Sequence, residues 1–260
     1  MFKQKGYWFV FLLNLKAIYK NSDATFSYIA DSKIYQLNSK REDDSRSLIF
    51  KHELQGGLTY IDGIHQRGEL MGNIYSLDKI SFESEDIVID CGANLGDLLL
   101  WFQNRFINIK YVGFEPSPEE FKCLKKNISQ HEVHQVALWN QDGVLSFYLS
   151  SQEADSSLIE PPSYNNVIKV NARRLDSYIR SEIKLLKLEA EGGELEVLEG
   201  LNNKIHLIEY ISADLGPERG KISLSTFVPV KNYLEAQNFS LISTNHQRYT
   251  FLFRNNNYQS

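Results

Sequence analysis

The sequence has little cysteine, and this scarcity restricts its chemistry. Cys91 and Cys123 are the only two cysteines in 260 residues. Two thiols cannot form the disulfide framework of a small secreted domain or a four-cysteine zinc site. We therefore expect the chain to work in a reducing compartment, the cytoplasm.

Long hydrophobic runs are also missing, since none approaches the roughly 20 residues that span a bilayer. Lysines precede the apolar run 7–13, which gives it the outline of a signal peptide. Asn14 and Lys16 interrupt that run, and no small-residue cleavage site follows promptly. We expect a helix over residues 6–20 that packs on the body of the protein. The alternatives are a helix that lies on a membrane surface or a partner, and a cleaved signal.

The sequence has fewer basic than acidic residues: 28 Lys and Arg against 33 Asp and Glu, which gives a net charge of −5. A mildly acidic chain is a poor candidate for wrapping a nucleic-acid backbone, so no nucleic-acid partner is expected. Hydrophobic residues make up 42% of the chain, enough for a full core, which excludes global disorder. The oligomeric state is left open.

The first 82 residues predict an N-terminal elaboration made of a helix and a few antiparallel strands. Strand-like pieces lie at 26–37 and 48–54 on either side of a polar stretch, 39–47. Two glycine-containing pairs, Gly56-Gly57 and Asp62-Gly63, are typical of turns. The sequence thus divides into residues 1–82 and a larger domain, 83–260.

From residue 86 onward, short apolar strands alternate with helical stretches, which predicts a mostly parallel sheet with helices on both faces. The expected strands are 87–89, 111–114, 134–139, 144–149, 183–188 and 206–213. The expected helices are 95–106, 118–128, 194–201 and 226–237. Segments 239–243 and 249–253 predict a closing hairpin that adds an antiparallel strand near one sheet edge.

A glycine-containing loop follows the first of these strands directly and opens a helix. Gly92 and Gly96 allow a sharp turn and the close approach of a ligand. A dinucleotide site also wants glycines at the third and sixth positions of the loop, where Asn94 and Asp97 stand. Asp97 would also put negative charge near a pyrophosphate. An NAD-dependent oxidoreductase is therefore kept only as an alternative.

Carboxylates around this loop favour a cofactor with a cationic end. Asp90 ends the strand and Asp97 begins the helix, so the ammonium and sulfonium charges of S-adenosylmethionine would suit them. Glu115 ends the next strand, 23 residues after Gly92, where an acid hydrogen-bonds ribose hydroxyls. The third strand ends near the expected adenine position. The predicted cofactor-binding residues are Asp90, Gly92, Ala93, Asn94, Gly96, Glu115, Pro116, Ala137 and Leu138.

The motifs together resemble the FkbM-type S-adenosylmethionine-dependent methyltransferases. The resemblance covers residues 86 to 253 and rests on 90–96, on Gly113-Phe114-Glu115-Pro116, on Arg174-Leu175-Asp176 and on the acidic signature 183–200. It implies a Rossmann-like, class I methyltransferase fold with a seven-stranded sheet. It also implies O-methylation of a hydroxyl of a sugar, a glycan or another small metabolite. A non-catalytic binding module on the same fold is a further alternative.

Three acids are the candidates for catalysis. Glu189 and Glu191 follow a buried strand and, two residues apart on it, would point to one face. Asp214 follows the neighbouring strand. Any of the three could accept the proton of an acceptor hydroxyl. The family has Asp where this chain has Glu189, so this carboxylate is one methylene longer. Glu189 and Asp214 could also hold Mg²⁺, but no third ligand is evident, and we predict no metal.

Polar loops supply the candidates for acceptor binding. Ser156 and Ser157 lie with Asp155 in a polar loop, and Arg219 lies in a glycine- and proline-containing loop after Asp214. Arg219 suits an anionic or hydroxyl-rich acceptor; its alternative is a turn pairing with Asp214 or Glu218. The glutamates of the preceding helix are expected to face solvent: Glu194, Glu196 and Glu199.

Overall fold

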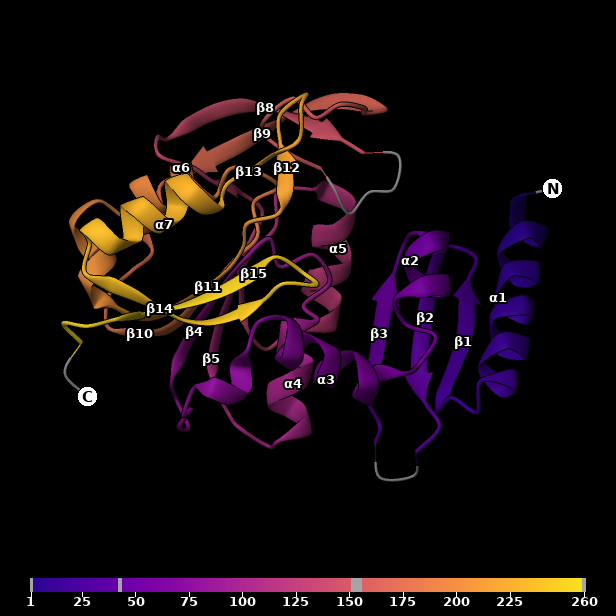
Figure 1. The fold of residues 1–260 in the computed structure, drawn as a ribbon. Coiled ribbons are helices and arrows are strands. Elements are labelled where there is room, and N and C mark those ends of the chain that lie inside the picture. The colour runs from indigo at the N-terminus through magenta and orange to yellow at the C-terminus, as the bar shows by residue number, and fades with distance from the viewer. Residues whose placement is uncertain (1, 42–43, 151–155, 259–260) are drawn as a thin grey trace.

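The computed structural model describes residues 2–41, 44–150 and 156–258. Its N-terminal part is a three-stranded antiparallel sheet in the order β1-β2-β3, covered by α1 (Figure 1). Asn14 of α1 bonds both the N–H and the carbonyl of Phe26, which fixes the helix to β1. The expected first helix therefore packs on the body of the protein. The elements are α1 (Phe2–Tyr19), β1 (Ala24–Ile29), β2 (Ile34–Ser39), β3 (Ser47–Phe50) and α2 (Glu53–Leu58).

The larger part contains the predicted seven-stranded sheet, in the order β14-β15-β11-β10-β4-β5-β6. Strands β11, β10, β4, β5 and β6 run parallel, and the closing hairpin β14–β15 pairs antiparallel with β11, as expected. The strands are β4 (Ile87–Cys91), β5 (Lys110–Phe114), β6 (Glu132–His134), β10 (Ile183–Leu188), β11 (Ile208–Asp214), β14 (Phe239–Asn245) and β15 (Thr250–Asn255).

Neighbouring residues of the central strands enter two different cores, one on each face of the sheet. Val88 and Leu185 face the core that α3, α4 and α5 cover, whereas Ile89 and Leu186 face the core that α6 and α7 cover. Burial on both faces explains the continuous apolar runs of these strands. The helices are α3 (Ile64–Ile74), α4 (Leu98–Asn104), α5 (Pro118–Asn127), α6 (Glu194–Glu199) and α7 (Phe227–Ala236), with 3₁₀ turns at Leu77–Lys79, Leu175–Ser177 and Asn202–Leu207.

Several expected elements differ from the structure. The strand expected over 48–54 ends at Phe50, and Gly56-Gly57 lies inside α2 rather than in a turn. The strand expected over 134–139 is two short strands in different sheets, β6 and β7. A second three-stranded sheet, β7-β9-β8, stands beside the main sheet, and its strand β9 was not predicted. The remaining strands are β7 (Ala137–Leu138), β8 (Gly143–Leu149), β9 (Asn166–Arg173), β12 (Pro217–Arg219) and β13 (Leu224–Ser225).

The division at residue 82 stays a prediction. Residues on both sides of it share one core, because Met71, Ile74 and Tyr75 pack with Leu98 and Trp101. In the described ranges, no helix combines the length and apolar character needed to cross a membrane.

Candidate active site

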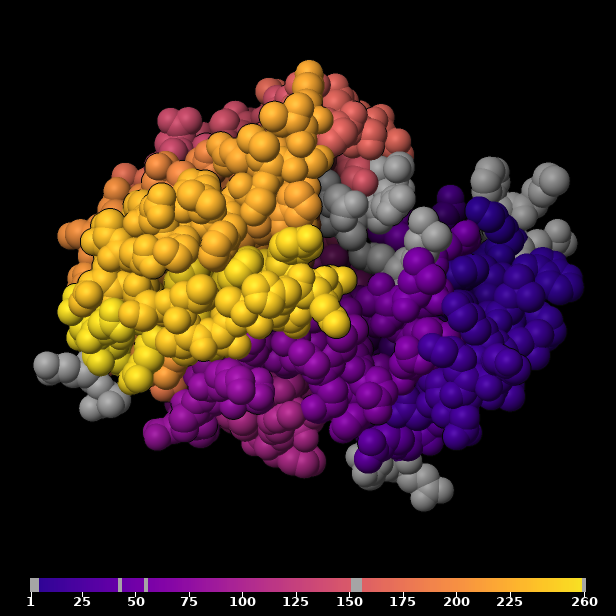
Figure 2. Space-filling view, viewed as in Figure 1, coloured from indigo at the N-terminus to yellow at the C-terminus, as the bar shows by residue number. Residues whose placement is uncertain are grey.

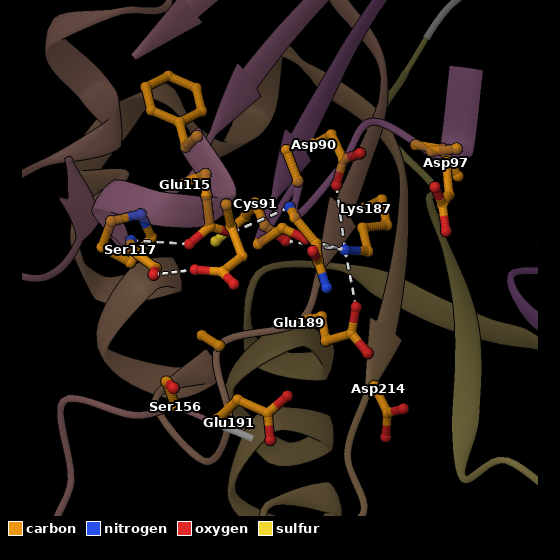
Figure 3. A pocket seen from close by; sticks show the side chains of 18 of the residues that line it. Asp90, Cys91, Asp97, Glu115, Ser117, Ser156, Lys187, Glu189, Glu191 and Asp214 are labelled. Carbon is orange, nitrogen blue, oxygen red and sulfur yellow. Dashed lines mark hydrogen bonds and ion pairs between the residues drawn. The ribbon is translucent and has the colours of Figure 1, made fainter. Parts of the chain in front are cut away.

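A cavity of about 500 Å³ opens at the carboxyl ends of β4, β5, β10 and β11 (Figure 3). Its opposite wall comes from residues 58–75 of the N-terminal part. Most predicted site residues line it: Asp90, Gly92, Ala93, Asn94, Glu115, Pro116, Ala137, Leu138, Ser156, Glu189, Glu191 and Asp214. Gly96, Ser157 and Arg219 are not among the lining residues, and Asp155 lies outside the described residues.

The glycine loop turns tightly beneath the cavity. Gly92 has φ +73°, and a Cβ there would lie 2.2 Å from the carbonyl oxygen of Glu189. The N–H groups of Gly92 and Ala93 both donate to the carbonyl of Phe114, at 3.1 and 2.9 Å. These two amides are therefore engaged within the protein and do not point toward a pyrophosphate.

Glu115 is buried and holds the loop from the neighbouring strand. Its Oε2 accepts the Asn94 N–H at 2.9 Å, and its Oε1 accepts the Ser117 N–H at 2.8 Å. Burial raises the pKa of Glu115 to about 8, against the lowering effect of these two backbone bonds. A carboxyl group with this pKa is largely protonated at neutral pH, so it can both donate to and accept from hydroxyls.

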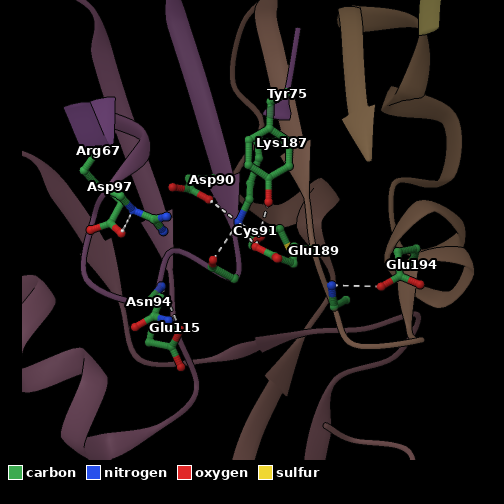
Figure 4. Close-up of polar contacts among 12 residues, drawn as sticks. Arg67, Tyr75, Asp90, Cys91, Asn94, Asp97, Glu115, Lys187, Glu189 and Glu194 are labelled. Atoms are coloured by element: carbon green, nitrogen blue, oxygen red, sulfur yellow. Dashed lines mark hydrogen bonds and ion pairs between the residues drawn. The ribbon is translucent and has the colours of Figure 1, made fainter. Parts of the chain in front are cut away.

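Lys187, to which sequence reasoning gave no role, lies at the centre of the site (Figure 4). Its Nζ is 3.0 Å from Oδ1 of Asp90 and 2.9 Å from Oε2 of Glu189, and it donates to the carbonyls of Cys91 and Gly92 at 3.2 and 2.7 Å. The residue is 2% exposed. The signal in the sequence is a lysine within a buried apolar strand, since such a charge needs a partner.

Two tyrosine hydroxyls complete the bonding of these carboxylates. Tyr111 donates to Oδ2 of Asp90 at 2.6 Å, and Tyr75, which follows α3, donates to Oε2 of Glu189 at 2.9 Å. Asp90 thus forms an ion pair with Lys187 and accepts a hydrogen bond from Tyr111, and it shares the Lys187 ammonium with Glu189.

Asp97 is similarly compensated, which corrects the expectation of a free negative charge at the start of α4. The Tyr60 hydroxyl lies 3.1 and 3.0 Å from its two carboxylate oxygens, and Nε of Arg67 donates to Oδ2 at 2.7 Å. Tyr60 and Arg67 belong to the N-terminal part. They therefore fix that part against the glycine loop.

The environments of Glu189 and Asp214 push their pKa values apart. Burial alone would raise the pKa of Glu189, but the adjacent Lys187 ammonium and the Tyr75 hydroxyl hold it below its usual range. Asp214 ends β11, and its Oδ1 accepts the Gly216 N–H at 3.1 Å. Burial, followed by the charge of Glu189, raises the pKa of Asp214 to about 7.

Glu191 does not continue the strand, contrary to the expectation that it shares a face with Glu189. Strand β10 ends at Leu188, and Glu191 adopts φ +48° in the following loop. Glu194 holds this loop, because its Oε1 accepts the N–H groups of Ala190 and Gly192 at 2.9 and 3.0 Å. Glu194 is 1% exposed, so the prediction of a solvent-facing glutamate was wrong.

Ser157 and Arg219 support the loop rather than the cavity. The Ser157 hydroxyl donates to the carbonyl of Glu191 at 2.7 Å. Arg219 donates to both carboxylate oxygens of Glu196, at 2.8 and 2.6 Å, and to the carbonyl of Gly192. The ion-pair partner of Arg219 is Glu196.

Metal ligands do not gather in the described part of the chain, where no group of three or more His, Cys, Asp or Glu side chains could hold an ion.

Comparisons with known proteins show what this chain is similar to. The pattern of the methyltransferase FkbM domain matches residues 90–251. A methyltransferase 1 of Beauveria bassiana (strain ARSEF 2860) is 24% identical over 194 residues, 63% of this chain and 76% of that protein. The 31-O-demethyl-FK506 methyltransferase FkbM of Streptomyces tacrolimicus is 25% identical over 167 residues, 50% of this chain and 64% of that protein.

Among solved structures, the methyltransferase FkbM of Methylobacillus flagellatus KT superposes with a TM-score of 0.51 at 16% identity. The superposition covers 71% of this chain and 47% of that one, so it supports the fold alone. The chain thus spans less than two thirds of both the Streptomyces relative and the solved protein. Because the matched family consists of methyltransferases, the alternative of an NAD-dependent oxidoreductase is set aside. With its pattern matched over more than half of the sequence, the chain belongs to the FkbM family of S-adenosylmethionine-dependent methyltransferases.

Proposed function

We propose that the chain transfers the methyl group of S-adenosylmethionine to a hydroxyl oxygen of a sugar, glycan or other small-molecule acceptor. The observation that carries this proposal is Asp214, which lines the cavity with a pKa raised to about 7. A general base is most effective when its pKa lies near the working pH. Asp214 therefore suits the removal of a hydroxyl proton near neutral pH.

The cavity suits a nucleoside cofactor. Its volume of about 500 Å³ is in the range of small-molecule sites. Glu115, Ala137 and Leu138 line the cavity; we assign Glu115 to hydrogen bonds with ribose hydroxyls and the other two to apolar contact with a base. Oδ1 of Asn94 is buried and, within the described ranges, has no hydrogen-bond partner, so a ligand donor would satisfy it.

Arg67 suits the amino-acid end of this cofactor. Its Nε donates a hydrogen bond to Asp97. Its two terminal nitrogens donate to no residue in the described part of the chain. The side chain lines the cavity. Guanidinium nitrogens bind carboxylates in charge-assisted hydrogen bonds, so Arg67 would hold the carboxylate of the cofactor.

The reaction divides between cofactor and protein. Bound S-adenosylmethionine supplies a methyl group on a positively charged sulfur, which makes that carbon strongly electrophilic. The protein aligns the acceptor oxygen with the methyl carbon and removes its proton. Asp214 takes that proton as the acceptor oxygen forms its bond to the methyl carbon and the carbon–sulfur bond breaks, which leaves S-adenosylhomocysteine. Glu189 stays ionised, because Lys187 and Tyr75 hold it, and it links the end of β10 to the end of α3.

The acceptor class draws support from one relative. The Streptomyces protein is named for 31-O-demethyl-FK506, a compound that lacks a methyl group on an oxygen. A hydroxyl acceptor is therefore proposed here as well. Ser156 and Glu191 line the same cavity, and we assign them to contacts with that acceptor.

Asp214→Asn tests the proposal. Transfer of a labelled methyl group to a panel of sugars and hydroxylated macrolides should fall by about 10²- to 10⁴-fold, the usual contribution of a general base. The wild-type rate should rise with pH through about 7, and the variant should lose this dependence. Calorimetric titration of S-adenosylhomocysteine should give similar affinities for both proteins.

The matched control is Asp142→Asn, an exposed turn residue that should change neither rate nor affinity. An Asp214→Asn variant that keeps the wild-type rate would remove Asp214 from catalysis. Tight binding of S-adenosylhomocysteine without methylation of any hydroxylated acceptor would favour the non-catalytic binding module.

A further inference from the structure

One face of α1 presents large apolar side chains to solvent. Seven of them are between 49% and 89% exposed, in a helix of 18 residues: Tyr7, Trp8, Phe11, Leu12, Leu15, Ile18 and Tyr19. Their spacing of three, four and seven residues places them on one side. Val10, Leu13 and Ala17, on the other side, are buried against the small sheet. The helix forms an outer edge of the molecule (Figures 1 and 2).

The same helix concentrates positive charge on an acidic protein. Residues 1–22 contain Lys3, Lys5, Lys16 and Lys20 and no Asp or Glu, which gives +4 against −5 for the whole chain and −9 for residues 23–260. Lys5 and Lys20 pair with Glu53 and Asp62 in exposed ion pairs, which are weak. The charge of the helix therefore complements an anionic surface.

A second copy of this chain fits the face less well. A helix of 18 residues is about 27 Å long, so a stripe about 10 Å wide offers roughly 270 Å². A stable protein interface needs about 800 Å² from each partner. Two copies packed through α1 would also bring together the eight lysines of their residues 1–22, a segment that contains no acid.

We propose that α1 lies in the surface of an anionic lipid bilayer. Apolar side chains with flanking lysines are the composition of helices that bind in the plane of a membrane interface. Phe11, Leu12, Leu15 and Ile18 enter the acyl boundary. Tyr7, Trp8 and Tyr19, near the two ends of the stripe, lie at headgroup level, where amphipathic aromatic rings are favoured.

Vesicle sedimentation of the full chain tests this assignment. The protein should bind vesicles of 70% phosphatidylcholine and 30% phosphatidylglycerol at least tenfold more tightly than vesicles of phosphatidylcholine alone. The double variant Phe11→Glu/Leu15→Glu should lose that binding. Trp8 fluorescence in the wild type should be quenched by lipids that are brominated close to the headgroup.

The matched control is Ile222→Glu/Val228→Glu, which places two acids at apolar positions that are 76% and 62% exposed elsewhere on the surface. It should bind vesicles like the wild type. An unchanged melting temperature and unchanged S-adenosylhomocysteine affinity would confirm that both variants are folded. Equal binding of wild type and the α1 variant, or no binding at all, would overturn the proposal. So would light scattering that shows a dimer lost in the α1 variant, because the face would then belong to a second copy.

Discussion

At the scale of single residues, Arg67 is assigned to only one end of the cofactor. Arg67→Gln should weaken S-adenosylhomocysteine binding by about 10- to 100-fold, since a hydrogen bond to a charged group contributes about 1.5–3 kcal/mol. Methylthioadenosine lacks the amino-acid carboxylate, so its affinity should change little. Calorimetry with the two ligands measures the difference.

Arg105→Gln is the control for this prediction, because Arg105 also pairs with an acid, Glu69, on a nearby helix. It should leave both affinities unchanged. Equal losses for the two ligands in Arg67→Gln would mean that the substitution disturbs the loop through Asp97 instead of removing a contact with the carboxylate.

The raised pKa of Asp214 also predicts how the stability of the folded protein depends on pH. Its pKa is raised from 3.8 to about 7 in the folded protein, so the folded state binds this proton more tightly than the unfolded state. Stability is therefore lost as pH rises from about 4 to 7. Asp214→Asn removes this loss, and its melting temperature should rise relative to wild type by several degrees between pH 4.5 and pH 8. A difference that stays constant over this range would contradict the raised pKa.

Sequence reasoning found the residues at strand ends but not their partners. Glu115 and Asp214 could be placed because the carboxyl ends of parallel strands meet at one edge. The roles of Lys187 and Tyr75 could not be derived from local pattern. Tyr75 bonds Glu189 across 114 positions of the chain, and no local spacing encodes such a contact.

At the scale of elements, the loop between β10 and α6 depends on one buried carboxylate. Glu194→Ala would leave the N–H groups of Ala190 and Gly192 and the hydroxyl of Thr226 without their acceptor. Unsatisfied buried groups cost about 1–3 kcal/mol each, so we expect the three groups together to lower the unfolding free energy by at least about 3 kcal/mol. Denaturant titration measures it.

Glu199→Ala is the matched control on the same helix, because Glu199 is exposed and bonds only Asn140 among the described residues. It should cost less than about 1 kcal/mol. Equal losses of unfolding free energy in the two variants would show that a change in helix propensity, and not the lost hydrogen bonds to the loop, causes the destabilisation.

The central strands could be predicted from their continuous apolar runs, because a strand that is buried on both faces has apolar residues at successive positions. The second sheet was harder. In β9, Ile168, Val170 and Ala172 alternate with exposed residues, which is a weaker signal of a strand covered on one face. The stretch 134–139 contains two strands that belong to different sheets, a change of partner that hydrophobicity does not record.

At the scale of the whole molecule, the division at residue 82 can be tested by shortening the chain. Residues 83–260 alone lack Tyr75 and the Arg67 contact to Asp97. We expect this fragment to lose cooperative melting and S-adenosylhomocysteine binding. A fragment of residues 59–260 keeps these contacts and should bind measurably better. Equal binding by both fragments would place residues 59–82 outside the functional unit.

The wall formed by residues 58–75 has a consequence for how members of this family diverge. The family pattern begins at residue 90, so this wall lies outside it, although it encloses the same cavity as the glycine loop. Mutations at wall positions such as Leu58, Thr59 and Leu70, which line the cavity but are not among the residues that bond Asp97 or Glu189, can therefore accumulate without altering the loop's turn, its hydrogen bonds or Glu115. A lineage that exchanged these positions and kept Tyr60, Arg67 and Tyr75 would keep every family motif and enclose a cavity of different shape, open to a different acceptor.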